Sequence, residues 1–252
     1  MKSKLLLLGL LTISFSSIAQ NVHFGVKTGL NVSMLFLSGS IPSGGTTSSS
    51  TGFIIGGEAE FKIDNKFSIQ PELIFSTDGG KYQYTNYISS NPSISYNYSQ
   101  TIEMNSISLP VVAKFYLNDE LSFDAGLQLN YLLSAKSNLN YNSQGLTITG
   151  SNDMENNQSL LLASTIPVQK VTINHNYDLN KLNFGFVIGT TYKLKNGFFF
   201  QARYNLAITS FTKNANVLSG TESTTGADGD NRYKGATLKN ASFQLALGYK
   251  FK

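Results

Sequence analysis

Residues 22–36 alternate between two kinds of side chain without interruption. The even positions carry Val22, Phe24, Val26, Thr28, Leu30, Val32, Met34 and Phe36, whereas the odd positions are mostly polar or glycine. Only a β-strand has this period of two, because its successive side chains point to opposite faces. Ordinary strands have about five or six residues, and about 9–11 residues cross a bilayer as a tilted strand. The segment is therefore long enough to be a membrane-crossing strand.

The first nineteen residues have the features of an export signal. Lys2 and Lys4 precede an apolar run over 5–15, and Ser17 and Ala19 frame a small-residue cleavage site. We therefore expect a signal peptide over 1–19. Removal of this segment takes away two lysines and lowers the formal net charge of the chain from +4 to +2. A charge so close to neutral gives no indication of nucleic acid binding. The chain has no cysteine, which excludes disulfides, thiolate metal ligands and a cysteine-linked lipid anchor.

Seven further segments alternate in the same way as the first. The eight segments are 22–36, 52–63, 67–76, 107–117, 121–131, 182–194, 198–206 and 241–251. Mean hydropathy is slightly negative, as one polar face per strand requires. The prediction is an all-β fold, an eight-stranded antiparallel up-and-down transmembrane β-barrel that forms a single domain over 20–252.

The connections between these segments alternate in length. Long connections follow the first, third, fifth and seventh segments, and three-residue turns at 64–66, 118–120 and 195–197 follow the others. Long extracellular loops opposite short periplasmic turns are typical of outer-membrane barrels. Pro71 and Pro110 lie inside two strands, where the missing N–H predicts a bulge or a weak spot.

Aromatic residues decide which face points outward. A lipocalin also has eight antiparallel strands, but its apolar face lines a cavity. Here aromatic residues on the apolar face recur eight residues apart, as Phe53 and Phe61, Phe67 and Phe75, Phe123 and Tyr131, Phe184 and Tyr192, and Phe243 and Phe251. Eight residues at roughly 3.3 Å each, tilted by about 40°, rise about 20 Å, near the height of a lipid-facing band between two aromatic girdles. The apolar face is therefore predicted to contact lipid.

Three sequence motifs resemble the outer-membrane β-barrel families of Bacteroidota known as porin-family or PorT-like proteins. They are the opening Phe-Gly-Val-Lys-Thr-Gly-Leu-Asn at 24–31, Ile-Ser-Leu-Pro-Val-Val-Ala-Lys-Phe-Tyr at 107–116, and the closing Leu-Gly-Tyr-Lys-Phe at 247–251. The resemblance covers the whole mature chain and implies an outer-membrane location. Such barrels serve structural, transport, adhesion and secretion-related roles, so the resemblance is specific for architecture and not for activity.

With the apolar face outward, charged side chains point into the barrel. They are Lys27, Glu58, Glu60, Lys62, Glu72, Lys114, Asp124, Lys193 and Arg203. Eight strands enclose a space that side chains can fill, and unpaired buried charges are costly. We therefore predict that Lys27, Glu58, Glu60, Glu72, Lys114, Asp124 and Arg203 form a lumen charge network that plugs the barrel. A narrow channel for small solutes is the alternative.

The sequence gives little support for catalysis, a cofactor or a metal. Its two histidines, His23 and His175, are predicted at opposite ends of the barrel. No P-loop or Gly-x-Ser-x-Gly elbow is present. The segment 228–231 has oxygen ligands at calcium-loop spacing but lacks the distal glutamate of an EF-hand, so a solvated turn is the better interpretation. We expect a non-enzymatic protein without a cofactor.

The long connections are the candidate interaction region. The connection 134–181 is longer than a hairpin needs and alternates weakly at 146–148 and 168–174, which predicts strands that continue beyond the membrane. The tyrosines Tyr82, Tyr84, Tyr96 and Tyr98 flank a Ser-Ser-Asn-Pro turn, which predicts a projecting hairpin. Tyrosine with Asn and Ser is typical of adaptable contact surfaces. We predict a surface-contact role for this hairpin.

The expected partners follow from these surfaces. Outer-membrane lipids contact the apolar face, and an extracellular or envelope protein is the partner expected for the hairpin. No nucleic acid is expected, and a monomer is the expected oligomeric state. An accessory role in a secretion system is a further alternative that only the family resemblance suggests.

Overall fold

The computed structural model describes residues 22–38, 45–88, 91–143, 146–154, 159–163, 170–174, 177–215, 220–221 and 237–251. The predicted signal peptide over 1–19, His175 and the segment 228–231 lie outside the described residues. Within these ranges, no helix has the length and apolar character needed to cross a bilayer.

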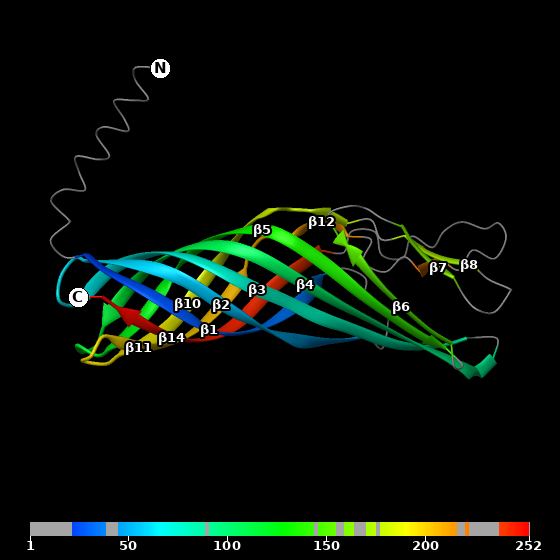
Figure 1. The fold of residues 1–252 in the computed structure, drawn as a ribbon, viewed down its shortest axis with the longest axis horizontal. Coiled ribbons are helices and arrows are strands. Elements are labelled where there is room, and N and C mark those ends of the chain that lie inside the picture. Colours follow the sequence, from blue (N-terminus) through cyan, green and yellow to red (C-terminus); the bar gives the residue numbers. More distant parts are fainter. Residues whose placement is uncertain are drawn as a thin grey trace, which may run out of the picture.

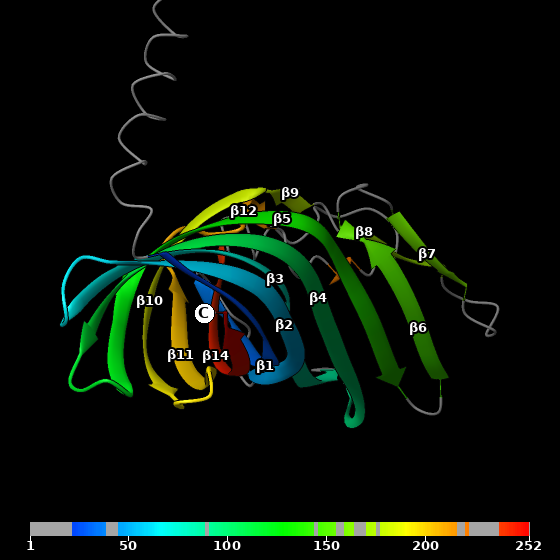
Figure 2. The same cartoon turned by 60° about the vertical axis from the view of Figure 1, so that its left-hand side comes forward.

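Eight of the described strands form one closed antiparallel ring (Figure 1). They are β1 (Val22–Ser38), β2 (Thr46–Lys62), β3 (Phe67–Ile88), β4 (Asn91–Tyr116), β5 (Leu121–Ser143), β10 (Leu182–Lys193), β11 (Phe198–Ala207) and β14 (Thr237–Lys250). The order around the ring is β10-β11-β14-β1-β2-β3-β4-β5, and pairing of β5 with β10 closes it. Figure 2 gives a view closer to the barrel axis. The predicted up-and-down barrel is confirmed.

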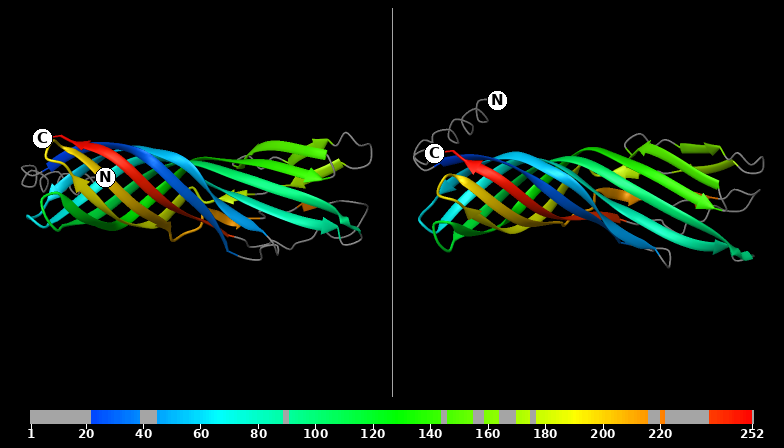
Figure 3. Two further views of the ribbon diagram at one scale, coloured as in Figure 1. Left: turned by 90° about the horizontal axis from the view of Figure 1, so that it is seen from below. Right: turned by 60° about the horizontal axis from the view of Figure 1, so that its bottom comes forward.

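The two ends of the barrel differ. At one end, here called the turn end, short turns join the strands and the C-terminus lies beside them (Figure 1). At the other, here called the extended end, β3, β4 and β5 continue beyond the ring as a curved sheet (Figure 3). There β6 (Leu146–Asp153) pairs with the upper part of β5.

Five short strands complete the described structure. In one small sheet β8 (Lys170–Asn174) pairs with β7 (Ser159–Ala163) and β13 (Gly220–Thr221). In a second, β9 (Tyr177–Leu179) pairs with β12 (Thr212–Ala215). The strands predicted at 146–148 and 168–174 correspond to β6 and β8.

Several strands extend further than the sequence predicts at the extended end. β3 continues to Ile88 instead of ending at residue 76, and β4 begins at Asn91 instead of residue 107. β2 begins at Thr46, where the sequence is Thr-Thr-Ser-Ser-Ser-Thr. Both faces are polar there, so the alternation that marks a strand disappears although the backbone still pairs. The predicted ends at 76 and 107 are therefore wrong.

Asn and Asp side chains close two of the short turns. The Asp64 carboxylate accepts hydrogen bonds from the amides of Lys66 and Phe67, at 2.6 and 2.8 Å. Asn118 does the same for Glu120 and Leu121, at 3.0 and 2.7 Å. Both are Asx-type turns.

In the third turn, Gly197 has a φ of +96°, which glycine adopts without steric cost. The three short turns are therefore encoded locally, and they lie together at the turn end.

The exposure of the side chains shows which face of the strands points out of the barrel. Leu127, midway between Phe123 and Tyr131 on β5, is 59% exposed. On the opposite face, Asn31 is fully buried although it is polar. Apolar side chains therefore cover the outside of the barrel and polar ones fill it, which is the reverse of a lipocalin.

The two strand prolines weaken the wall without bending it. The β2–β3 and β3–β4 registers are unshifted across Pro71. The regular pairing nevertheless skips Ala59 and Glu60 in the β2–β3 ladder and Leu73 and Leu109 in the β3–β4 ladder. Pro110 keeps the β4–β5 register as well. Of the two predicted outcomes, the structure has the weak spot and not the bulge, because a missing N–H removes ladder bonds without inserting a residue.

Candidate functional site in the barrel lumen

The inward side chains of β3 show how the lumen is layered. From the turn end they are Ser68, Gln70, Glu72, Ile74, Ser76, Asp78, Gly80 and Tyr82. Glu72 belongs to a charged layer, and Ile74 packs with Ile54 and Ala246 in a thin apolar layer above it. Ser76 and Asp78 then line a polar cavity. Tyr82 belongs to a buried apolar cluster at the extended end.

The charged layer is centred on Glu72. The Arg203 guanidinium donates two hydrogen bonds to its carboxylate, at 2.7 and 2.8 Å. Lys27 donates a third at 2.7 Å. β3 and β11 are four positions apart in a ring of eight, so the Arg203–Glu72 pair spans the lumen from wall to wall. Such bidentate, charge-assisted contacts are the strongest that these side chains make.

Asp124 on β5 extends the layer sideways. Its carboxylate lies 3.2 Å from the Arg203 guanidinium and 3.6 Å from the Lys114 ammonium. Thr191 and Gln201 donate to the same carboxylate, at 2.8 and 3.3 Å. Neighbouring strands therefore supply the neutral donors that the remaining lone pairs of Asp124 need.

A second group of pairs lies toward the turn end. The Lys250 ammonium donates to Glu60 and lies 3.5 Å from Glu58, and the Tyr116 hydroxyl also donates to Glu60. Lys27 lies 3.4 Å from Glu58 and so links this group to the first. The pairs form one connected network across the barrel.

The network is balanced in charge. Among the described residues the buried cations are Lys27, Lys114, Arg203 and Lys250, and the buried anions are Glu58, Glu60, Glu72 and Asp124. Four charges of each sign compensate one another, as burial of ions requires. Since every carboxylate has a cation nearby, the arrangement is suited to ion pairing and to filling the lumen.

The structure brings all seven residues of the predicted network together, and it separates two others from them. Lys62 is exposed at the turn end, where its ammonium lies 5.9 Å from the ring centre of Tyr116. Lys193 is half-buried at the same end. Both continue the inward-facing positions of their strands, but as the last residues there they lie at the mouth of the barrel, where it opens to solvent, and not in the buried network.

Sequence reasoning missed Lys250, Tyr116 and Gln70. The sequence does contain a signal for Lys250, because this residue continues the series of inward positions on the last strand. The seven predicted residues also leave one negative charge uncompensated, and Lys250 supplies the missing positive charge. Gln70 donates to Glu72 at 2.6 Å and accepts from Lys250 at 3.2 Å, but one amide among many carries no recognisable pattern.

The tyrosine hairpin is formed by β3 and β4, whose register pairs Tyr84 with Tyr98 and Asn86 with Tyr96. Tyr82 differs from the prediction. Its side chain is 6% exposed and packs in the buried apolar cluster, so it does not belong to a contact surface. The sequence groups Tyr82 with the other tyrosines of the hairpin, whereas the inward position of this residue on β3 decides the environment of its side chain.

The described histidine is next to the charge network but is not a member of it. His23 is half-buried at the turn end, and its backbone pairs with Glu60. Its Nδ1 atom has no hydrogen-bond partner. No group of three or more His, Asp or Glu side chains within the described ranges could hold a metal ion.

Comparison with known proteins gives one family match. The model of the family described as "Outer membrane protein beta-barrel domain" matches residues 18–213. No curated protein sequence matches the chain.

The chain is also similar to several solved structures. Ail of Yersinia pestis is 12% identical, with 92% of this chain and 99% of Ail covered and a TM-score of 0.36. Neisserial surface protein A is 12% identical, with 90% and 97% covered and a TM-score of 0.41. OprG of Pseudomonas aeruginosa is 12% identical, with 92% and 96% covered and a TM-score of 0.40.

Proposed function

Because this chain belongs to the outer membrane protein β-barrel domain family, we propose that it is a non-enzymatic barrel with a closed lumen, acting through the strands at its extended end. The protein lies in the outer membrane, so the turn end faces the periplasm and the extended end faces outward. The role is structural or one of surface interaction.

The balanced charge network is the observation that carries this proposal. Eight buried charges and their amide and hydroxyl partners occupy the lumen on the periplasmic side. The Arg203–Glu72 pair spans opposite walls, and its two hydrogen bonds would have to break before an ion could pass. Breaking them would leave buried charges without partners, which costs several kcal/mol.

The extended end supports an interaction role. From Ile74 and Ser108 outward, β3 and β4 pair without interruption to Tyr87 and Ser95, well above the outward aromatic residues Phe53 and Phe75. A long hairpin held by its own ladder presents a defined surface at low entropic cost. Three tyrosines, Tyr84, Tyr96 and Tyr98, lie on it.

The test replaces these three tyrosines by serine in the full chain. We expect the Tyr84→Ser, Tyr96→Ser, Tyr98→Ser variant to keep the heat-modifiable migration of a folded barrel but to lose the proteins that copurify after cross-linking on intact cells. A matched triple variant with Tyr131→Ser, Tyr192→Ser and Tyr204→Ser in the lipid-facing band controls for tyrosine content. An unchanged set of cross-linked proteins in the hairpin variant would contradict the interaction role.

A further inference from the structure

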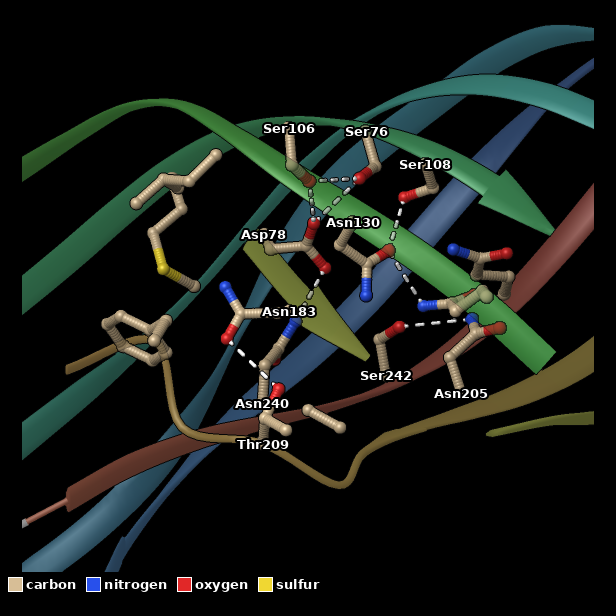
Figure 4. Close-up of a pocket in the computed structure, with 16 residues that line it drawn as sticks. Ser76, Asp78, Ser106, Ser108, Asn130, Asn183, Asn205, Thr209, Asn240 and Ser242 are labelled. Carbon is tan, nitrogen blue, oxygen red and sulfur yellow. Dashed lines mark hydrogen bonds between the residues drawn. The ribbon is translucent and has the colours of Figure 1, made fainter. Parts of the chain in front are cut away.

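A polar cavity lies in the lumen between the charge network and the apolar cluster of the extended end. It has a volume of about 60 Å³, room for a few groups of the size of water. Its polar lining is made of serine, threonine, asparagine and glutamine from several strands, with Asp78 as the only ionisable residue (Figure 4). Met104, Leu132 and Phe211 line it as well and belong to the apolar cluster above it.

Asp78 is held by neutral donors only. The amides of Asn31 and Asn240 donate to its Oδ1 atom, at 2.8 and 3.0 Å. The hydroxyls of Ser76 and Ser106 donate to its Oδ2 atom, at 2.7 and 3.3 Å. Four donors facing one carboxylate stabilise its negative charge.

No cation among the described side chains compensates this charge. None of the ion pairs between described residues includes Asp78. The charge network cannot do so, because its own eight charges already balance and Ile54, Ile74 and Ala246 lie in between. Asp78 is only half-buried and lies three residues beyond Phe75 on β3, so a counter-ion from solution has access to it.

Two further acceptors beside Asp78 lack donors. The amide nitrogens of Asn31 and Asn240 are used by Asp78, and both side-chain oxygens are buried without a hydrogen-bond partner. Asn31 is fully buried. Its orientation is fixed, because its nitrogen also donates to the Thr77 carbonyl at 2.9 Å. Asp78 and Asn240 both line the cavity, whereas Asn31 supports Asp78 without belonging to the lining.

We propose that this cavity binds a small monovalent cation, with Asp78 as its counter-charge and the side-chain oxygen of Asn240 as a neutral ligand. Carboxylate, amide and hydroxyl oxygens are the ligands that hard cations prefer. One carboxylate matches one positive charge, whereas a divalent ion would leave the site with a net charge. The cavity leaves room for the ion to keep some of its water.

The test measures thermal unfolding of the detergent-folded full chain in NaCl, KCl and N-methyl-D-glucamine chloride at equal ionic strength. N-methyl-D-glucamine is too large for the cavity. We expect the Tm to be about 2–8 °C higher in NaCl or KCl than in N-methyl-D-glucamine chloride, because a bound ion stabilises only the folded state. In Asp78→Asn this difference disappears. Equal Tm values of the unsubstituted protein in the three salts would overturn the proposal.

Glu103→Gln is the matched control, since Glu103 is exposed and its backbone pairs with Gly79, next to Asp78. We expect the Tm difference between NaCl or KCl and N-methyl-D-glucamine chloride to stay unchanged in this variant. Loss of that Tm difference would assign the effect to surface charge and overturn the proposal. Rubidium-soaked crystals of the unsubstituted protein test the site directly. An anomalous peak at Asp78 supports it, and density for water alone overturns it.

Discussion

Arg203 and Glu72 lie on opposite walls of the barrel and are joined by two hydrogen bonds of 2.7 and 2.8 Å. They are 131 residues apart in the sequence. Because β3 and β11 share no backbone ladder, this contact ties together two walls that otherwise meet only through their neighbours. A closed lumen requires this pair to stay intact, because the pair crosses the lumen from wall to wall.

Removing one partner of this pair should destabilise the barrel strongly. We expect Arg203→Met to cost about 3–5 kcal/mol in the free energy of unfolding, because Lys27 is then the one described ion-pair partner left to the buried charge of Glu72. The double variant Arg203→Met, Glu72→Met should lose less than the sum of the single variants. Urea unfolding in lipid vesicles measures both.

Lys62→Met is the control for this experiment, because Lys62 is exposed at the turn end. We expect a change within about 0.5 kcal/mol. Strict additivity of the Arg203 and Glu72 substitutions would show that the two side chains do not interact.

The last strand depends on a glycine that faces an aromatic ring. A Cβ atom at Gly248 would overlap the ring of Phe199, which is fully buried and paired with it across β11 and β14. We therefore expect Gly248→Ala to cost about 1–3 kcal/mol through overpacking. The added substitution Phe199→Leu should recover part of this loss, as measured by the same urea unfolding.

Gly57→Ala is the matched control for Gly248→Ala. The nearest atom to a Cβ at Gly57 is the Gly25 carbonyl oxygen, 3.6 Å away, which is an ordinary contact. This substitution should leave stability unchanged or raise it by a few tenths of a kcal/mol. If both glycine variants behave alike, ring contact is not the cause.

The lipid-facing band predicts a depth-dependent cost for a new charge. Leu127 is exposed midway between Phe123 and Tyr131, so Leu127→Arg should cost about 2–4 kcal/mol in vesicles. Leu133 lies on the same face of β5, two residues beyond Tyr131, and Leu133→Arg should cost about 0–1 kcal/mol. Equal costs for the two variants would mean that the outer face does not contact lipid.

Most of the fold could be predicted because strand alternation is a local signal that is repeated eight times. Residues such as Phe24 and Lys27 show their face by position alone. The strand ends could not be predicted, because above the membrane both faces of segments such as β2 from Thr46 are polar while the backbone continues to pair.

The candidate site was only partly predictable for a related reason. The seven predicted network residues follow from inward position and charge, but their partners Gln70 and Tyr116 depend on the curvature of the ring. Asp78 lies beyond the predicted end of β3 at residue 76, where no apolar alternation marks an inward face, so its place in the lumen could not be predicted. Tyr82 was misplaced for the same reason.

A planar-bilayer recording tests the closed lumen most directly. Purified, folded protein should give no steady conductance steps in 1 M KCl, and the variant Glu72→Ala, Arg203→Ala should give small ones, because the pair that spans the lumen is then absent. Steady single-channel steps from the unsubstituted protein would contradict the closed lumen and support a narrow channel for small solutes.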